Sequence, residues 1–257
     1  MINKGAIAAK KILDEFGLDS LNEISVEELI HARDIAFEEK HMPNCDGRIV
    51  FGKSKAKITV NSNIQYPGRK RFTLAHELGH FELQHNQNTF LEDTPLTLDY
   101  FKNGNQEYEA NQFATELLMP QNIFVNYTKG KKFSPDLLRD IAEHFQTSIT
   151  SATFRYLELG QHPIFLFHCR DKRVIYWKNT SNYYRKVKDI TKLSPPDDSV
   201  AMEFFNSGII YRKDESAQEI IKSTWFETND YDSEDEYFEY AIVTKDYNTV
   251  LSVVWEN

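Results

Sequence analysis

Apolar residues recur at intervals of three and four along much of the first 160 residues, which is the spacing of one helix face. Ser25 with Glu28 forms a capping box at the start of one expected helix. Pro120 closes another, and Gly160 is well placed to end the last. The helices are expected at residues 6–16, 25–33, 69–85, 106–119, 134–144 and 148–159.

Strand patterns interrupt this helical part and then follow it. Residues 48–51 and 57–61 hold apolar clusters around Gly52-Lys53-Ser54, which predicts a hairpin. From Pro163 onward, aromatic and β-branched runs dominate, and the last two runs alternate like the strands of a second hairpin. These later runs span residues 164–168, 174–177, 240–244 and 250–255.

The change from helical to strand-like residue patterns near Gln161 predicts two domains in an α+β fold class. We expect residues 1–160 to form a mainly helical domain with a small β-sheet. We expect residues 161–257 to form a small antiparallel α+β module. A chain of 257 residues is long enough to bury a core in each of them.

The charge balance is acidic, with a formal net charge of −9 that is spread over both predicted domains. Neither domain has the basic balance that drives phosphate-dominated binding of nucleic acids. The opening residues lack the continuous apolar run of a signal peptide, and no run approaches the roughly 18 residues of a membrane span. Cys45 and Cys169 lie far apart, which indicates neither a disulfide framework nor a thiolate metal site. We therefore expect a cytoplasmic protein.

The strongest chemical signal lies in the third expected helix, where His76 and His80 stand four residues apart and Glu77 follows the first. Positions i and i+4 share one helix face, so both imidazoles can reach a single zinc ion. Glu77 projects about 100° round the helix from His76, which suits a general base acting on zinc-bound water. The alternative is a pair of core histidines, since so short a motif also arises by chance. Gly79 disfavours it, because a helix that accepts a cost of about 1 kcal/mol usually needs a close approach there.

A catalytic zinc needs a third protein ligand. The helix expected at 106–119 offers Glu107, which shares a face with the small residues Ala110, Asn111 and Ala114. Such a face can press closely against the histidine helix. Glu109 is a rival, although it points about 160° away from Glu107. The residue pattern alone leaves both glutamates open.

Two stretches in this order resemble a known family. RFTLAHELGH at residues 71–80, followed by EYEANQFATELLMP at residues 107–120, is similar to the ImmA/IrrE family of zinc metallopeptidases. The resemblance covers roughly residues 25–160 and leaves the C-terminal module largely unaccounted for. In that family the glutamate three positions before the Ala-Asn pair is the third zinc ligand, which maps onto Glu107. The resemblance also implies a zincin-like, specifically gluzincin-like, fold for the helical domain.

The resemblance further implies an intracellular zinc endopeptidase that cuts a specific regulatory protein, such as a transcriptional repressor. Cleavage would switch on genes of a mobile element or a stress response. One zinc ion, held by His76, His80 and Glu107, would lower the pKa of its bound water to about 7. Glu77 would accept the proton and deliver it to the leaving amine. Two imidazoles and a carboxylate fit zinc best, although similar ligands accept manganese or iron.

Two further features of such a site remain open in the sequence. An extended substrate could add to a sheet edge near residues 57–61 by strand pairing. A donor to the oxyanion could come from one of several aromatic or histidine side chains. These are Tyr100, Tyr108, Tyr127, His85 and His144.

Residues 137–156 suggest a second hypothesis, a DNA-binding transcriptional regulator. Two short helices joined by Phe-Gln-Thr-Ser resemble a helix-turn-helix. The second helix has Arg155 as its only basic residue, with Glu158 close behind. Packing on the peptidase core is therefore favoured over contact with DNA.

The C-terminal module suggests a third hypothesis, a ligand-gated sensor on a metallopeptidase-like scaffold. Residues 227–239 hold seven acidic and no basic residues, which is more typical of a solvated loop than of a cation site. Aromatic residues of the module could line a pocket, although core packing is their commoner use. They are Tyr176, Trp177, Tyr183, Tyr184, Trp225 and Phe226.

Overall fold

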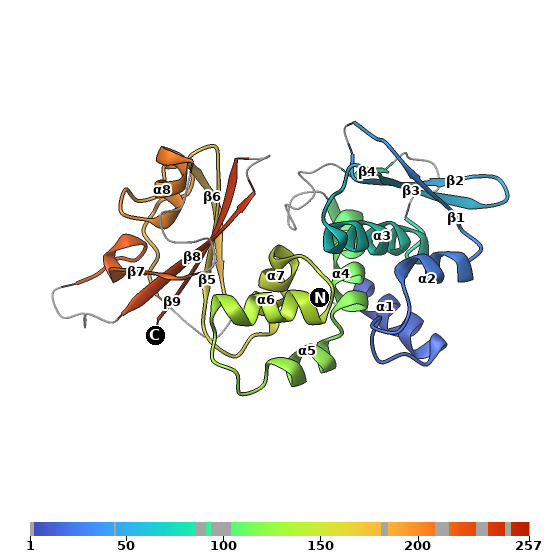
Figure 1. Cartoon of the computed structure of the whole chain (residues 1–257), viewed down its shortest axis with the longest axis horizontal. Helices are drawn as coiled ribbons and strands as arrows, with labels where there is room; N and C mark the ends of the chain where they lie inside the picture. Colours follow the sequence, from blue (N-terminus) through green and yellow to red (C-terminus); the bar gives the residue numbers. More distant parts are fainter. Residues whose placement is uncertain are drawn as a thin grey trace. The chain divides into compact units, whose positions relative to one another are not determined.

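The structure is a computed structural model that describes residues 3–43, 45–85, 91–93, 104–180, 185–208, 216–229, 236–244 and 248–256. Its first elements are α1 (Lys4–Phe16), α2 (Val26–Ala32), β1 (Ala36–Lys40), β2 (Gly47–Phe51), β3 (Ala56–Asn61), α3 (Pro67–Glu82), β4 (Leu91–Asp93), α4 (Gly104–Leu118) and α5 (Gln121–Thr128). Then follow α6 (Pro135–His144), α7 (Ile149–Leu159), β5 (Phe165–Arg170), β6 (Arg173–Asn179), α8 (Val200–Ser207), β7 (Gln218–Ile220), the 3-10 helix η2 (Lys222–Thr224), β8 (Tyr237–Thr244) and β9 (Thr249–Glu256) (Figure 1). The predicted α+β class is confirmed.

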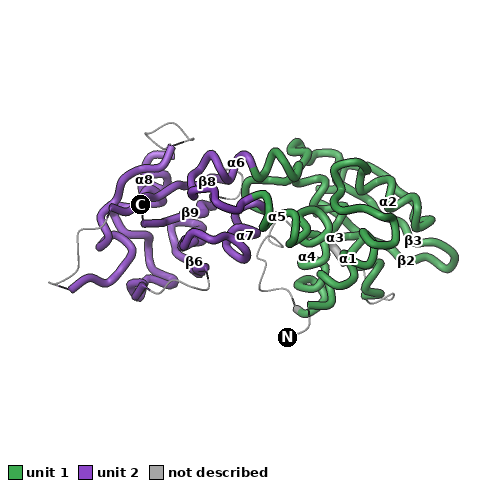
Figure 2. The backbone as a smooth tube through the Cα atoms, turned by 90° about the horizontal axis from the view of Figure 1, so that it is seen from below, with its two compact units in different colours: residues 1–127, 141–151 green, residues 128–140, 152–257 purple. Residues whose placement is uncertain are grey.

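Contacts within the chain divide it into two units, residues 1–127 with 141–151 and residues 128–140 with 152–257 (Figure 2). Helices α6 and α7 each contribute residues to both units. The domain boundary near residue 161 stays a prediction. No helix in the described part of the chain has both the length and the apolar character needed to cross a membrane.

The ends of the first helices follow from particular residues. Asn3 caps α1 by accepting a hydrogen bond from a backbone N–H of the first turn, and Gly17 ends that helix with a left-handed φ of 64°. Ser25 and Glu28 form the predicted capping box at the start of α2. Pro67 is the first residue of α3, a position at which proline is favoured.

The small sheet of the first unit has the strand order β1-β3-β2-β4. Strands β2 and β3 form the predicted antiparallel hairpin, and β1 pairs parallel with the other side of β3. The expectation that a substrate adds to an edge at residues 57–61 is therefore wrong, because β3 is paired on both sides. Strand β1, which the sequence pattern did not predict, covers the side that would have been open.

Helix α3 contacts β2 and β3 as well as α4, and Figure 1 shows it between the sheet and α4. A Cβ atom at Gly79 would lie 2.9 Å from Cδ1 of Phe113 on α4, which is the close approach that the glycine predicted. Helix α1 packs on α4 in turn, and a Cβ atom at Gly5 would lie 2.2 Å from the carbonyl oxygen of Glu109. The histidine helix is thus held in the interior of its unit.

The second unit is built on an antiparallel sheet with the strand order β6-β5-β9-β8-β7, and β8 and β9 form the predicted hairpin. Helix α8 packs against β8 and β9. Trp225 is fully buried and stacks on Phe167 with ring centroids 4.0 Å apart, and Phe226 belongs to the same hydrophobic cluster. These two aromatic residues therefore pack the core. Tyr183 and Tyr184 lie outside the described residues.

Glu239 corrects the expectation of a solvated acidic loop. It lies on β8 and is fully buried. Its carboxylate accepts hydrogen bonds at 3.1 Å from the backbone N–H groups of Val200 and Ala201 at the start of α8. The indole of Trp225 donates at 3.0 Å, and the hydroxyl of Ser252 also donates. Burial raises the pKa of Glu239, while these donors act in the opposite direction. Residues 230–235 lie outside the described part of the chain.

Candidate metal centre

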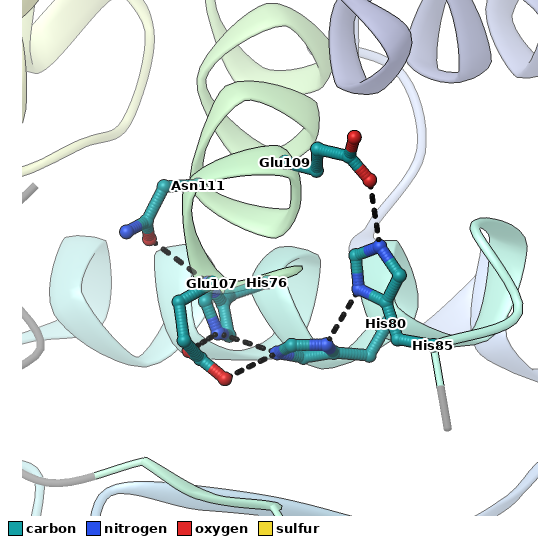
Figure 3. A network of polar contacts seen from close by, with 6 residues as sticks. All are labelled: His76, His80, His85, Glu107, Glu109 and Asn111. Atoms are coloured by element: carbon teal, nitrogen blue, oxygen red, sulfur yellow. Dashed lines mark hydrogen bonds and ion pairs between the residues drawn. The ribbon is translucent and has the colours of Figure 1, made fainter. Parts of the chain in front are cut away.

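Three ligand atoms from α3 and α4 meet in the interior of the first unit (Figure 3). His76 and His80 lie one turn apart on α3, and their Nε2 atoms are 2.9 Å from each other. The Glu107 carboxylate of α4 lies 3.2 Å from His76 Nε2 and 3.5 Å from His80 Nε2. Both histidines are 1% exposed. Among the described residues, these three form the group that could hold a metal ion.

The spacing of these atoms can be compared with a zinc coordination sphere. Zinc binds histidine nitrogen and carboxylate oxygen at about 2.0–2.2 Å in a tetrahedron, which places its ligand atoms about 3.3–3.5 Å apart. The separations of 2.9, 3.2 and 3.5 Å lie close to that value. The donor set of two imidazoles and one carboxylate is that of a catalytic zinc site.

The protonation of the group also suits a cation. The side-chain oxygen of Asn111 lies 2.9 Å from His76 Nδ1 and can only accept, so His76 carries a proton on Nδ1 and its Nε2 faces Glu107. Burial lowers the pKa of His80 to about 4, against the effect of nearby Glu107. Burial raises the pKa of Glu107, but the neighbouring His76 and His80 outweigh it, so its pKa lies below the ordinary value. At neutral pH these shifts leave His80 neutral and Glu107 ionised.

Glu77, the expected general base, is 1% exposed and follows His76 on α3. Its carboxyl group lies against the backbone of β2 at Gly47. A Cβ atom at Gly47 would be 2.9 Å from Glu77 Oε1 and 2.5 Å from the Cγ2 atom of Thr73. Only a residue without a side chain leaves room for the carboxylate at this place.

The two rival glutamates of α4 have different surroundings. Glu107 lies beside His76 and His80, whereas the Glu109 carboxylate lies 3.0 Å from His85 Nε2 and 3.2 Å from Lys4 Nζ. Figure 3 shows the two carboxylates on different sides of α4. This agrees with the angle of about 160° between positions two apart on a helix.

The remaining oxyanion candidates lie elsewhere or make other contacts. Tyr108 is 40% exposed on the surface of α4. Tyr127 and His144 stack on each other, with ring centroids 4.1 Å apart. His85 contacts His80 and Glu109, and Tyr100 lies outside the described residues.

The predicted helical pair is present as α6 and α7, and the basic residue of its second helix is buried. Arg155, the basic residue of α7, is 3% exposed and pairs with Glu158 at 2.9 Å. A recognition helix needs exposed donors to reach base edges and phosphates. Arg155 is therefore not exposed for such contacts, and the regulator hypothesis stays a prediction.

The roles of two residues near the centre, Asn111 and His85, were not predicted from the sequence. Asn111 lies four positions after Glu107, on the face expected to meet the histidine helix, but amides are common on such faces and nothing singled it out. His85 was considered only as an oxyanion donor. Its place beside His80 depends on how the chain turns after α3, which the helical pattern does not contain.

A family model described as an IrrE N-terminal-like domain, of peptidase family M78, matches residues 32–156. The chain is also 37% identical over 87 residues to "Uncharacterized immunity region protein 2" of Bacillus phage phi105. That match covers 34% of this chain and 51% of the relative, so the chain spans about half the length of the curated relative that it matches.

Among solved structures, the chain is similar to one described as "Mycobacterium tuberculosis transcriptional regulator". The TM-score is 0.60 and the sequence identity 14%, over 99% of this chain and 76% of the other. At this identity the likeness concerns the fold alone. It extends beyond the residues of the family match and includes the C-terminal part of the chain.

Proposed function

Because residues 32–156 belong to the ImmA/IrrE family, within peptidase family M78, we propose that this chain is a zinc-dependent endopeptidase that cleaves a regulatory protein. One observation carries the proposal: two imidazole Nε2 atoms and a carboxylate converge at 2.9–3.5 Å in a buried place. Buried imidazole nitrogens and a carboxylate oxygen that face one another are stabilised when a cation lies among them.

His76, His80 and Glu107 would hold the ion, and Glu77 would serve as the general base. Bound zinc would supply a Lewis acid that lowers the pKa of a water molecule to about 7. Glu77 is buried beside His76, so its carboxylate is shielded from bulk water. It accepts a proton from the attacking water and delivers that proton to the nitrogen of the leaving amine. The tight contact with Gly47 restricts the positions that the carboxylate can adopt.

The proposed substrate is a transcriptional repressor. The family resemblance supports this choice, and the name of the phage relative, an immunity region protein, supports a regulatory role. A repressor substrate implies action in the cytoplasm. The formal net charge of −9 and the buried Arg155 give no support to a role that depends on DNA binding.

Metal analysis of the purified full chain with three variants tests the proposal. We expect the wild type to retain about one zinc per chain. Glu107→Gln should lose most of its zinc, whereas Glu77→Gln should keep it. Glu116→Gln is the matched control, because it removes a carboxylate from the same helix without touching the centre. Wild-type protein that stays free of metal after supplementation with zinc would contradict the proposed zinc-dependent activity.

Cleavage is tested with a proteome-derived peptide library read by mass spectrometry. The zinc-loaded wild type should produce new peptide ends that Glu77→Gln does not produce. Cleavage patterns that are identical for these two proteins would contradict the role of Glu77. Chelation with EDTA should abolish the wild-type pattern, and added zinc should restore it.

A further inference from the structure

The second nitrogen of His80 begins a row of polar contacts that leads away from the metal centre (Figure 3). His80 Nδ1 lies 2.9 Å from His85 Nδ1, and His85 Nε2 lies 3.0 Å from Glu109 Oε2. The other oxygen of Glu109 lies 3.2 Å from Lys4 Nζ. Three elements contribute to this row: the end of α3, the first turns of α4 and the start of α1.

The far end of the row determines where each proton lies. An ionised carboxylate only accepts, so the proton between His85 and Glu109 belongs to His85 Nε2. With Nε2 donating to Glu109, Nδ1 of His85 is the nitrogen that can accept the proton carried by His80 Nδ1. His80 is left with a lone pair on Nε2, the atom that lies beside His76 and Glu107.

The backbone after α3 brings His85 into this position. Gln84 adopts a left-handed conformation with a φ of 53°, which is uncommon for a residue with a side chain. The N–H of His85 donates to the carbonyl of His80 at 3.0 Å, and the N–H of Gln84 donates to that of Phe81 at 3.1 Å. This pair of bonds is a Schellman motif, which reverses the chain against the last turn of the helix. The imidazole of His85 is consequently 5% exposed and lies against that of His80.

The two histidines of the centre are thus oriented by different means. Nδ1 of His76 contacts the side-chain amide of Asn111. Nδ1 of His80 contacts His85, which in turn contacts Glu109. Outer partners of this kind fix the tautomer of a metal-binding histidine and raise its basicity.

We propose that His85 is a positioning residue of the metal centre: supported by Glu109 and Lys4, it holds His80 with its proton on Nδ1 and its Nε2 lone pair toward the ion. This inference rests on the proposed zinc function. It assigns Glu109 a supporting place in the row, outside the ligand set. It also gives α1, which lies before the residues of the family match, a part in the site through Lys4.

Zinc affinity of three variants tests the proposal, measured by competition with a chromophoric chelator on the full chain. In His85→Asn the side-chain oxygen falls near the place of Nδ1 and can still accept from His80. In His85→Gln the terminal amide falls near the place of Nε2, so it reaches Glu109 but leaves His80 without its acceptor. We expect His85→Gln and His85→Ala to bind zinc about 10–100-fold more weakly than the wild type, and His85→Asn to stay within a few fold.

The pair of amide variants distinguishes positioning from simple packing, because asparagine and glutamine are both polar and of similar size to histidine. Equal zinc affinities for His85→Asn and His85→Gln would overturn the proposal. So would wild-type affinity in His85→Ala. The proposed function fails separately, through a wild type that binds no zinc at all.

A second measurement requires neither metal nor activity. A long-range proton–nitrogen correlation spectrum of the metal-free wild type, near neutral pH, reports which ring nitrogen of each histidine carries its proton. We expect the proton on Nδ1 in His80 and on Nε2 in His85. His80 with its proton on Nε2 would overturn the proposal, even if His85→Ala proved too unstable to study.

Discussion

Replacing Gly79 with alanine tests whether the close approach of α3 and α4 builds the metal centre. A Cβ atom at this position would lie 2.9 Å from Cδ1 of Phe113 and 3.1 Å from its Cβ and Cγ atoms. Carbon atoms in ordinary contact lie about 3.5–4.0 Å apart, so the Phe113 ring must move by about 0.5–1 Å. That ring is fully buried, so α4 has to share the displacement.

Two opposing terms determine the change in stability. Overpacking a core by one methyl group costs about 1–3 kcal/mol. Alanine in place of glycine stabilises a helix interior by about 1 kcal/mol. We therefore expect the free energy of unfolding of the metal-free protein to fall by about 0–2 kcal/mol. Ligand distances in a metal site must hold to about 0.2 Å, so a smaller shift of Glu107 already matters, and zinc affinity should fall at least about tenfold.

The assay combines urea unfolding in EDTA with zinc competition on the native protein. Phe113→Leu serves as the partner variant, because the smaller side chain makes room for the new methyl group. The double variant should lose less stability than the sum of the two single variants. A Gly79→Ala protein whose free energy of unfolding rises by about 1 kcal/mol and that binds zinc like the wild type would contradict the prediction, because helix propensity alone would then explain the change.

Three further predictions concern residues outside the ligand set. Gly47→Ala should push the Glu77 carboxylate from its place and lower kcat by about 10–100-fold at unchanged zinc content; loss of zinc in step with activity would contradict this. Lys4→Met should weaken zinc binding less than about fivefold, because Lys4 is 67% exposed and its ion pair with Glu109 is screened; a hundredfold loss of zinc affinity in the chelator assay would contradict this prediction. Glu239→Gln should lower the free energy of unfolding by about 1–3 kcal/mol in urea titrations, because an amide cannot accept from all four donors; unchanged stability would show that the four hydrogen bonds to the carboxyl group are not needed.

The local part of the site follows from sequence alone, because it depends on spacing within single helices. The capping box of Ser25 and Glu28 is confirmed, and His76 and His80 share one face of α3 as a separation of four residues requires. The choice between Glu107 and Glu109 is not local. It depends on which face of α4 meets α3, a contact between segments about 30 residues apart that spacing leaves open.

Three elements that the sequence pattern did not predict depend on features outside their own residues. Strand β1 has the sequence AFEEK, in which no alternation of apolar and polar residues signals a half-buried strand. It forms because β3 offers it a partner. Helix α5 begins directly after Pro120, the residue at which the pattern ends the preceding helix, so α5 was not predicted as a separate helix. Helix α8 begins at Val200 with Ser199 as its N-cap, and its first N–H groups bond to Glu239, a partner some 40 residues further along the chain.

The most direct test of the account is an anomalous diffraction map from crystals of the full chain grown with zinc. We expect one peak within about 2.0–2.2 Å of His76 Nε2, His80 Nε2 and a Glu107 oxygen. We also expect His85 to remain in contact with His80 Nδ1. A peak coordinated by Glu109 in place of Glu107, or zinc bound only elsewhere on the molecule, would contradict it.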